Sequence, residues 1–137
     1  MKSFLNTEEP VKQEEPAADI SPGARLVPRI TIQAFCEHSQ TAQLVESAVH
    51  DRRMSKVALT THNGGIDGAV ETYKTNPTPN LIIVETSLPP EDVPQALERL
   101  ADVCDATTRV IVLGHVNDVL LNRELIRSGI SEYIVLP

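Results

Sequence analysis

Residues Asn80–Pro89, Asn-Leu-Ile-Ile-Val-Glu-Thr-Ser-Leu-Pro, contain the strongest indication of how this chain folds. The four consecutive apolar residues of this stretch, 81–84, do not alternate with polar ones. This pattern is typical of a strand that is buried on both faces in the middle of a parallel sheet. The run ends at a single carboxylate, Glu85, and Pro89 ends the loop that follows. Because ligands bind at the carboxyl ends of strands in open α/β sheets, Glu85 is the first candidate for a functional residue.

The segments around this strand alternate between strand and helix patterns. Ser39 is the expected N-cap of the first helix, and either Asn117 or Asp118 that of the last. Regular alternation of this kind implies right-handed crossovers, so we predict an α/β fold. It is flavodoxin-like and doubly wound, with five parallel strands in the order 2-1-3-4-5. The predicted strands are 30–35, 57–60, 81–84, 110–113 and 133–136, and the predicted helices are about 39–53, 66–75, 91–103 and 118–128.

A doubly wound sheet of five strands usually has a fifth helix, and this sequence ends at Pro137 without one. Two explanations stay open: the sequence is a fragment, or a partner covers the bare face. An uncovered apolar face favours self-association, so we expect a homodimer.

Residues 1–28 have the composition of a disordered tail, and the ordered domain is predicted to span 29–137. The tail carries five acidic residues, three basic residues and four prolines. Its apolar content is too low to offset the entropy cost of ordering. A solvated leader is the simpler interpretation, and a tether or docking segment is the alternative.

Composition excludes several function classes. A net charge of −7 and a pI near 5.0 oppose nucleic-acid binding, which needs a basic surface. No apolar run approaches the roughly 20 residues that span a bilayer, so we expect no membrane insertion. Residues 1–7 lack the apolar core of a signal peptide, and two cysteines without CxxC spacing form no disulfide framework. These features indicate a cytoplasmic protein.

Two motifs give the chain a specific resemblance over about residues 29–137. Residues 80–89 resemble the Asp-Leu-x-x-x-Asp…Met-Pro motif of response-regulator receiver domains, which have the CheY-like fold. Residues 128–137, Ser-Gly-Ile-Ser-Glu-Tyr-Ile-Val-Leu-Pro, resemble the receiver motif Ala-Gly-Ala-x-Asp-Tyr-x-x-Lys-Pro. Tyr133 matches the position of the family's aromatic switch. The resemblance implies a domain that accepts a phosphoryl group on an aspartate.

The residues that this reaction requires are replaced. The phospho-acceptor position holds Glu85, the hydroxyl position holds Gly114 and the lysine position holds Leu136. The acidic pair that holds Mg²⁺ in receivers falls on Phe35 together with Ala34 or Cys36. Without Mg²⁺ and lysine, nothing neutralises the charge of the transition state. We therefore expect a non-phosphorylatable, non-enzymatic domain with no metal or other cofactor, in which Glu85 caps its loop or imitates a permanently charged aspartate.

The phrase Ile-Thr-Ile-Gln-Ala-Phe-Cys-Glu, residues 30–37, followed by such a degenerate receiver, resembles the N-terminal domain of the CpaE/TadZ family. This resemblance implies a role in Flp (tight adherence) pilus assembly, at the cell pole, with protein partners from the assembly and secretion machinery. The expected partner surface is the face of the last helix and last strand, including Arg123, Arg127 and Tyr133, together with the face left bare by the missing helix.

Two alternative functions stay open. The first is a working receiver in a two-component phosphorelay, with Glu85 as an atypical acceptor. The second is a small-nucleotide binder at the loop that contains Gly64 and Gly65, although a simple turn fits that loop better. His38, His62 and His115 each follow a strand, but no metal-ligand spacing joins them, so we interpret them as exposed loop residues.

Overall fold

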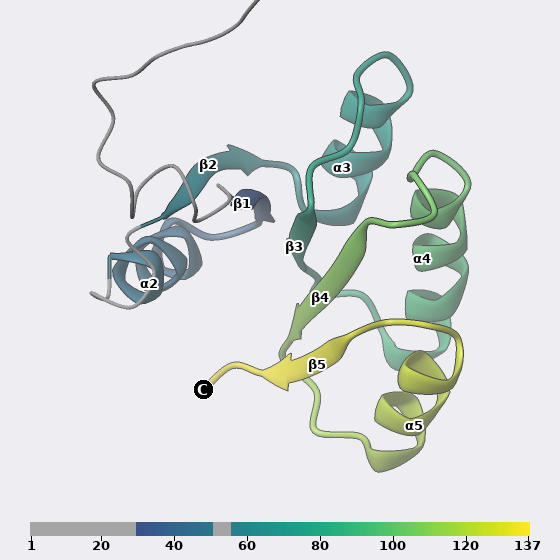
Figure 1. Ribbon diagram of the computed structural model, residues 1–137. Helices are drawn as coiled ribbons and strands as arrows, with labels where there is room; N and C mark the ends of the chain where they lie inside the picture. Colours follow the sequence, from purple (N-terminus) through teal and green to yellow (C-terminus); the bar gives the residue numbers. More distant parts are fainter. Residues whose placement is uncertain (1–29, 51–55) are drawn as a thin grey trace, which may run out of the picture.

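A computed structural model describes residues 30–50 and 56–137 of the chain (Figure 1). The predicted tail, 1–28, and the predicted end of the first helix, 51–53, lie outside the described residues. Within them, no helix is long and apolar enough to cross a membrane.

The core of the fold is a single parallel sheet. Its strand order is β2-β1-β3-β4-β5, and every pairing is parallel, which confirms the predicted topology. Because all five strands run in one direction, their carboxyl ends meet at one edge of the sheet. The strands are β1 (Ile30–Cys36), β2 (Val57–Asn63), β3 (Leu81–Glu85), β4 (Arg109–Gly114) and β5 (Glu132–Val135).

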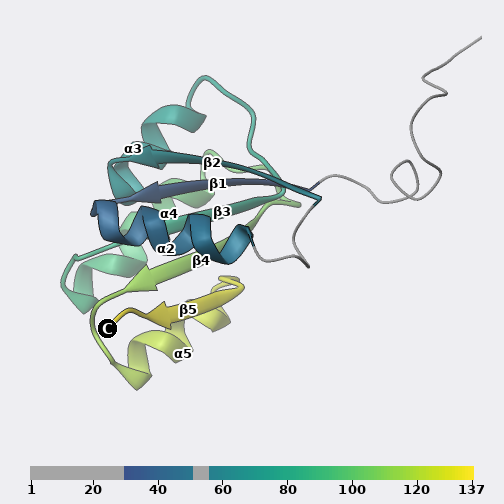
Figure 2. The same cartoon turned by 90° about the vertical axis from the view of Figure 1, so that its left-hand side faces the viewer.

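Helices cover the two faces of the sheet unequally. Three of them, α3, α4 and α5, pack on one face, and α2 lies alone on the other (Figures 1 and 2). In the described ranges the chain forms four α-helices, which confirms that the fifth helix of a doubly wound fold is missing there. The helices are α2 (Ser39–Val49), α3 (Gly65–Tyr73), α4 (Val93–Ala101) and α5 (Val119–Arg127), and a 3₁₀ turn at Pro90–Asp92 precedes α4.

Two details of the element boundaries differ from the prediction. β2 continues through Asn63 because the end of β1 pairs with it, with Cys36 in register with Asn63. Ser39 is the first helical residue of α2, and the N-cap is His38, which makes no side-chain capping hydrogen bond. At α5 the cap that the sequence left open is Asp118, whose carboxylate accepts a hydrogen bond from the backbone N–H of Leu121 at 3.0 Å.

The sheet separates a large core from a small one. The larger core, under α3, α4 and α5, contains Phe35, Ile82, Val84 and Val112, of which none is more than 1% exposed. The smaller core, under α2, consists of Ala34, Cys36, Val45 and Leu113, with partly buried apolar residues around it. Successive side chains of a strand point to opposite faces, so both cores draw on the same strands.

An apolar groove runs along the face that carries α2, between that helix and β5. Leu44, at 54% exposure, and Ile134, at 43%, are large apolar side chains at its margins. Among the described helices, only α2 borders this groove. It is lined entirely by apolar residues: Ile32, Leu44, Val45, Ala48, Val49, Leu81, Ile83, Ile111, Leu113, Ile134 and Leu136.

Candidate functional site

Glu85 lies at the carboxyl end of β3 and is completely buried, with 0% of its surface exposed. It shares the face of β3 with Leu81 and Ile83, so its side chain points toward the side of the sheet that carries α2. The loops that follow β1 and β4 bring their first residues to the same sheet edge. A buried carboxylate needs hydrogen-bond partners to offset the loss of solvation, and these loops provide them.

One oxygen of Glu85 is held by backbone amides. Its Oε1 atom accepts hydrogen bonds from the backbone N–H groups of Glu37 at 2.7 Å and of His38 at 3.1 Å. These two residues form the turn between β1 and α2, so the hydrogen bonds to Glu85 hold the backbone of that turn in place. Glu85 thus caps the turn after β1, whereas the sequence suggested that it caps the loop that follows its own strand.

The other oxygen contacts two histidines. Glu85 Oε2 lies 2.7 Å from Nδ1 of His38 and 2.7 Å from Nε2 of His115. The two imidazole rings meet edge to face, with centroids 5.6 Å apart. We call His38, Glu85 and His115 the carboxylate cluster.

The interpretation of His38 and His115 as exposed loop residues agrees with their position, but it did not anticipate that both contact Glu85. They lie 47 and 30 residues from Glu85 in sequence, so no spacing motif could reveal the cluster. The available signal was that each follows a parallel strand. His62 does not join the cluster: its ring stacks on Phe35 with centroids 4.7 Å apart.

The hydrogen bonds within the carboxylate cluster shift the pKa values of Glu85 and His38. Burial alone would raise the pKa of Glu85, but hydrogen bonds from His38, His115 and the Glu37 amide lower it to about 2. The hydrogen bond to Glu85 raises the pKa of His38. Glu85 therefore stays ionised at neutral pH despite its burial.

The position of the receiver metal site offers no carboxylate pair. Phe35 is buried between His62 and Tyr73, and Cys36 is buried in the smaller core. Magnesium prefers an octahedral set of oxygen ligands and usually keeps several waters. The carboxylate cluster has one carboxylate and two imidazoles instead, so the residues present do not fit the Mg²⁺ site of a receiver.

The hydroxyl position, Gly114, is occupied in space by Tyr133. A Cβ atom added to Gly114 would lie 2.6 Å from Cε1 of Tyr133, so a side chain there would collide with the ring. The Tyr133 hydroxyl donates a hydrogen bond to the carbonyl of Val116 at 2.8 Å, and only 7% of the residue is exposed. The ring fills the space in which a receiver would present its hydroxyl.

This burial affects the predicted partner surface. Arg123 and Arg127 are exposed on α5, whereas Tyr133 is buried and cannot present its ring to a partner. The lysine position, Leu136, is partly buried against the smaller core and has no amine to offer a phosphoryl group.

Gly64 and Gly65 pack closely against the strands. The N–H of Gly64 donates to the carbonyl of Cys36 at 3.1 Å, and a Cβ on Gly65 would lie 2.8 Å from the carbonyl oxygen of Glu85. Both have positive φ, at 101° and 56°. These contacts give the pair a role in the turn, which is the interpretation that the sequence favoured, and the N–H of Gly64 already has an acceptor.

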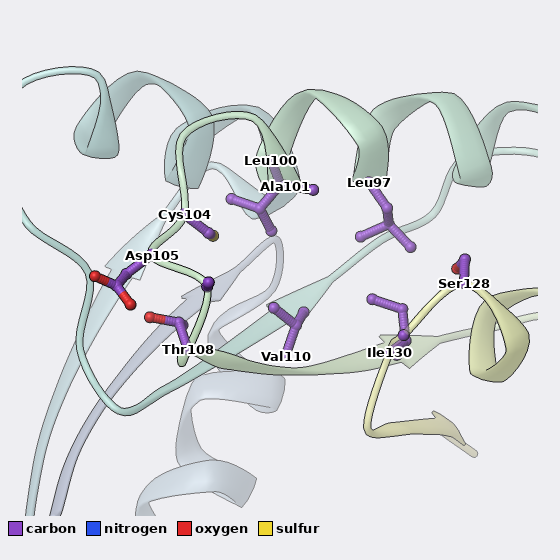
Figure 3. Close-up of a pocket in the computed structure, with 11 residues that line it drawn as sticks. Leu97, Leu100, Ala101, Cys104, Asp105, Thr108, Val110, Ser128 and Ile130 are labelled. Atoms are coloured by element: carbon purple, nitrogen blue, oxygen red, sulfur yellow. The ribbon is translucent and has the colours of Figure 1, made fainter.

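A separate hollow lies at the other end of the sheet, where α4 ends and β4 begins (Figure 3). Leu97, Val110 and Ile130 point into it, and Asp105 and Thr108 lie at one side. The Asp105 carboxylate accepts hydrogen bonds from the backbone and side chain of Thr107 within its own turn. The hollow thus has an apolar floor and one polar side, where the Asp105 carboxylate already accepts hydrogen bonds from Thr107.

Neither the protein-family models nor the curated proteins contain a match to the chain. Among solved structures, a pilus assembly protein CpaE from Caulobacter crescentus is 48% identical, with a TM-score of 0.77, covering 81% of this chain and 85% of that one. The chain belongs to the CpaE family of pilus assembly proteins. A CpaE2 pilus assembly protein from Sinorhizobium meliloti is 36% identical, with a TM-score of 0.76, covering 79% of this chain and 88% of that one.

The CpaE family shares its fold with receiver domains. The response regulator domain of Thermotoga maritima CheB superposes with a TM-score of 0.61 at 17% identity, covering 80% of each chain. A two-component response regulator of the LuxR family from Aurantimonas superposes with a TM-score of 0.61 at 15% identity, covering 79% of this chain and 74% of that one. These likenesses confirm the receiver fold of this CpaE-family chain and concern the fold alone.

Proposed function

We propose that this chain is a non-phosphorylatable pseudo-receiver that acts as a self-association and protein-interaction module in pilus assembly. Membership of the CpaE family supports the pilus role. The observation that carries the interaction role is the apolar groove between α2 and β5. The proposal includes a cytoplasmic position at the cell pole, which the CpaE/TadZ resemblance implies.

The replaced receiver positions support the non-enzymatic part of the proposal. Both oxygens of Glu85 already accept hydrogen bonds, and the residue is fully buried. A phosphoryl donor would have to open the carboxylate cluster before it reached this carboxylate. Gly114 and Leu136 provide neither a hydroxyl nor an amine for the transferred group. These features speak against the alternative of a working phosphorelay receiver.

We propose a second copy of the chain as the occupant of the groove. The groove lies beside β5, which is an edge strand of the sheet, and Leu44 and Ile134 project at its margins. In a twofold dimer the same patch meets itself, so projecting apolar side chains of one copy can enter the groove of the other. A stable interface buries roughly 1,200–2,000 Å² in total, which the groove and its margins together would have to supply.

The test is the oligomeric state of the full chain, measured by light scattering after size exclusion over a dilution series. We expect a dimer that Leu44→Glu and Ile134→Glu each convert to a monomer, because a buried unpaired carboxylate is costly. Leu120→Glu is the matched control, since Leu120 is 75% exposed on α5, on the opposite face. The Leu120→Glu variant should form a dimer to the same extent as the wild type.

Two results would overturn self-association through this groove. One is a wild-type chain that stays monomeric at every concentration, which would leave the groove to a different protein of the pilus machinery. The other is a dimer that survives both groove substitutions, which would place the interface elsewhere. Circular dichroism of each variant confirms that the fold is retained.

A further inference from the structure

The carboxylate cluster has the composition of a metal site. The cluster offers three ligand atoms, two imidazole nitrogens and one carboxylate oxygen, which all lie within 4.8 Å of one another. We propose that His38, Glu85 and His115 bind a divalent transition-metal ion of the zinc class. This inference goes beyond the interaction function and does not depend on it.

The donor set selects the class of metal. Two histidines and one glutamate are a known ligand set for zinc, with a fourth position left for water. Imidazole suits zinc, cobalt and nickel, whereas calcium and magnesium prefer oxygen. A site with a single carboxylate has too few oxygen ligands for a hard cation such as magnesium or calcium. Its two imidazoles suit a borderline metal ion such as zinc.

The present distances are compatible with a site that opens slightly around an ion. Glu85 Oε2 is 2.7 Å from each histidine nitrogen, which is a hydrogen-bond distance. Bonds of about 2.0–2.2 Å in a tetrahedral site place neighbouring ligand atoms roughly 3.3 Å apart. Each histidine nitrogen needs to move away from Oε2 by about half an ångström, and the two nitrogens, which lie up to 4.8 Å apart, need to approach each other. The histidine side chains are 56% and 33% exposed, which gives them room for both movements.

The surroundings of Glu85 favour binding through Oε2 alone. Its Oε1 atom is fixed by the N–H groups of Glu37 and His38, so the carboxylate has a set orientation before any ion arrives. Outer-shell hydrogen bonds of this kind orient metal ligands and are part of metal sites. The exposed sides of the two imidazoles provide the entry path, and an ion there would join the β1–α2 loop to the loop after β4.

The experiment uses the full chain without an affinity tag, stripped with a chelator and then titrated with ZnCl₂ by calorimetry. We expect one ion per chain, with micromolar or tighter affinity, and a higher melting temperature when zinc is in excess. CoCl₂ serves as a spectroscopic probe, because a four-coordinate cobalt site with imidazole ligands absorbs strongly in the visible range. MgCl₂ should neither bind nor compete.

Substitutions then locate the ion. His38→Gln and His115→Gln should each weaken zinc binding by at least about tenfold and remove the cobalt bands. Both side chains are partly exposed, so these variants should fold. The matched controls are His62→Gln and His50→Gln, because neither residue belongs to the cluster. Their binding should equal that of the wild type.

Two outcomes would overturn the proposal. One is the absence of stoichiometric zinc binding to the wild type, which would leave the cluster as hydrogen bonds around a buried carboxylate. The other is binding that persists in both His38→Gln and His115→Gln, which would place the ion elsewhere. Neither outcome alters the oligomeric state, so a failure here is distinguishable from a failure of the interaction function.

Discussion

Tyr133 lies directly over Gly114, so closely that a Cβ atom on the glycine would lie 2.6 Å from Cε1 of the ring. The tyrosine is anchored there by the hydrogen bond from its hydroxyl to the carbonyl of Val116. In this chain the residue at the aromatic-switch position and the residue at the hydroxyl position therefore form one packed unit. The space left by the missing side chain is the space that the ring occupies.

Gly114→Ala tests this packing. The added methyl group should displace Tyr133 and lower the free energy of unfolding by about 1–3 kcal/mol, as overpacking of a core does. The measurement is urea unfolding followed by circular dichroism. In a double-mutant cycle with Tyr133→Ala, the effects should be strongly non-additive, because removing the ring also removes the collision. Additive effects would mean that the two residues do not share one space.

The stability of the protein should fall in acid because of Glu85. Its pKa is lowered from 4.5 to about 2 in the folded chain. A depressed folded-state pKa contributes stability that is fully present above the unfolded value and is lost as the pH falls toward the folded value. For Glu85 this stability is lost as the pH falls from 4.5 to about 2. The pKa shift corresponds to about 3 kcal/mol of the free energy of unfolding.

This dependence is measured by urea unfolding at a series of pH values, with a chelator present. Glu85→Gln should flatten the profile across this pH range, while Glu91→Gln, which alters an exposed carboxylate, should keep the wild-type slope. An equal slope in wild type and Glu85→Gln would show that the carboxylate is not held as described.

Mg²⁺ with beryllofluoride should leave the domain unchanged. Beryllofluoride imitates a phosphoryl group on the acceptor of a receiver, but Glu85 is buried and fully hydrogen-bonded. The measurement is the amide NMR shifts of Glu85, Gly114 and Tyr133 during a titration. Saturable shifts that converge on Glu85 would instead support a working phosphorelay receiver.

Asp118 should contribute to stability as the N-cap of α5. Asp118→Ala removes the acceptor for the Leu121 N–H and should cost about 1 kcal/mol of the free energy of unfolding. Asn117→Ala is the matched control, since the neighbouring residue is the cap that the structure does not use. A larger loss for Asn117→Ala than for Asp118→Ala would contradict the observed cap.

The fold could be predicted from the sequence because hydrophobic patterning is a local property. The unbroken apolar run 81–84 required a strand buried on both faces, and its alternation with helical segments required a parallel sheet. The resemblance to receiver motifs then indicated that Glu85, Gly114 and Leu136 hold the replaced receiver positions.

The surroundings of Glu85 could not be predicted from the sequence, because they depend on tertiary packing. The sequence placed His38, His62 and His115 after strands, but it could not say which of them would face the carboxylate. That choice depends on side-chain direction and on the course of each loop, which arise from the packing of β1, β3 and β4. His62 extended β2 and stacked on Phe35, while the other two histidines closed over Glu85. A buried carboxylate must find donors, and the loops that end at its sheet edge were the ones within reach.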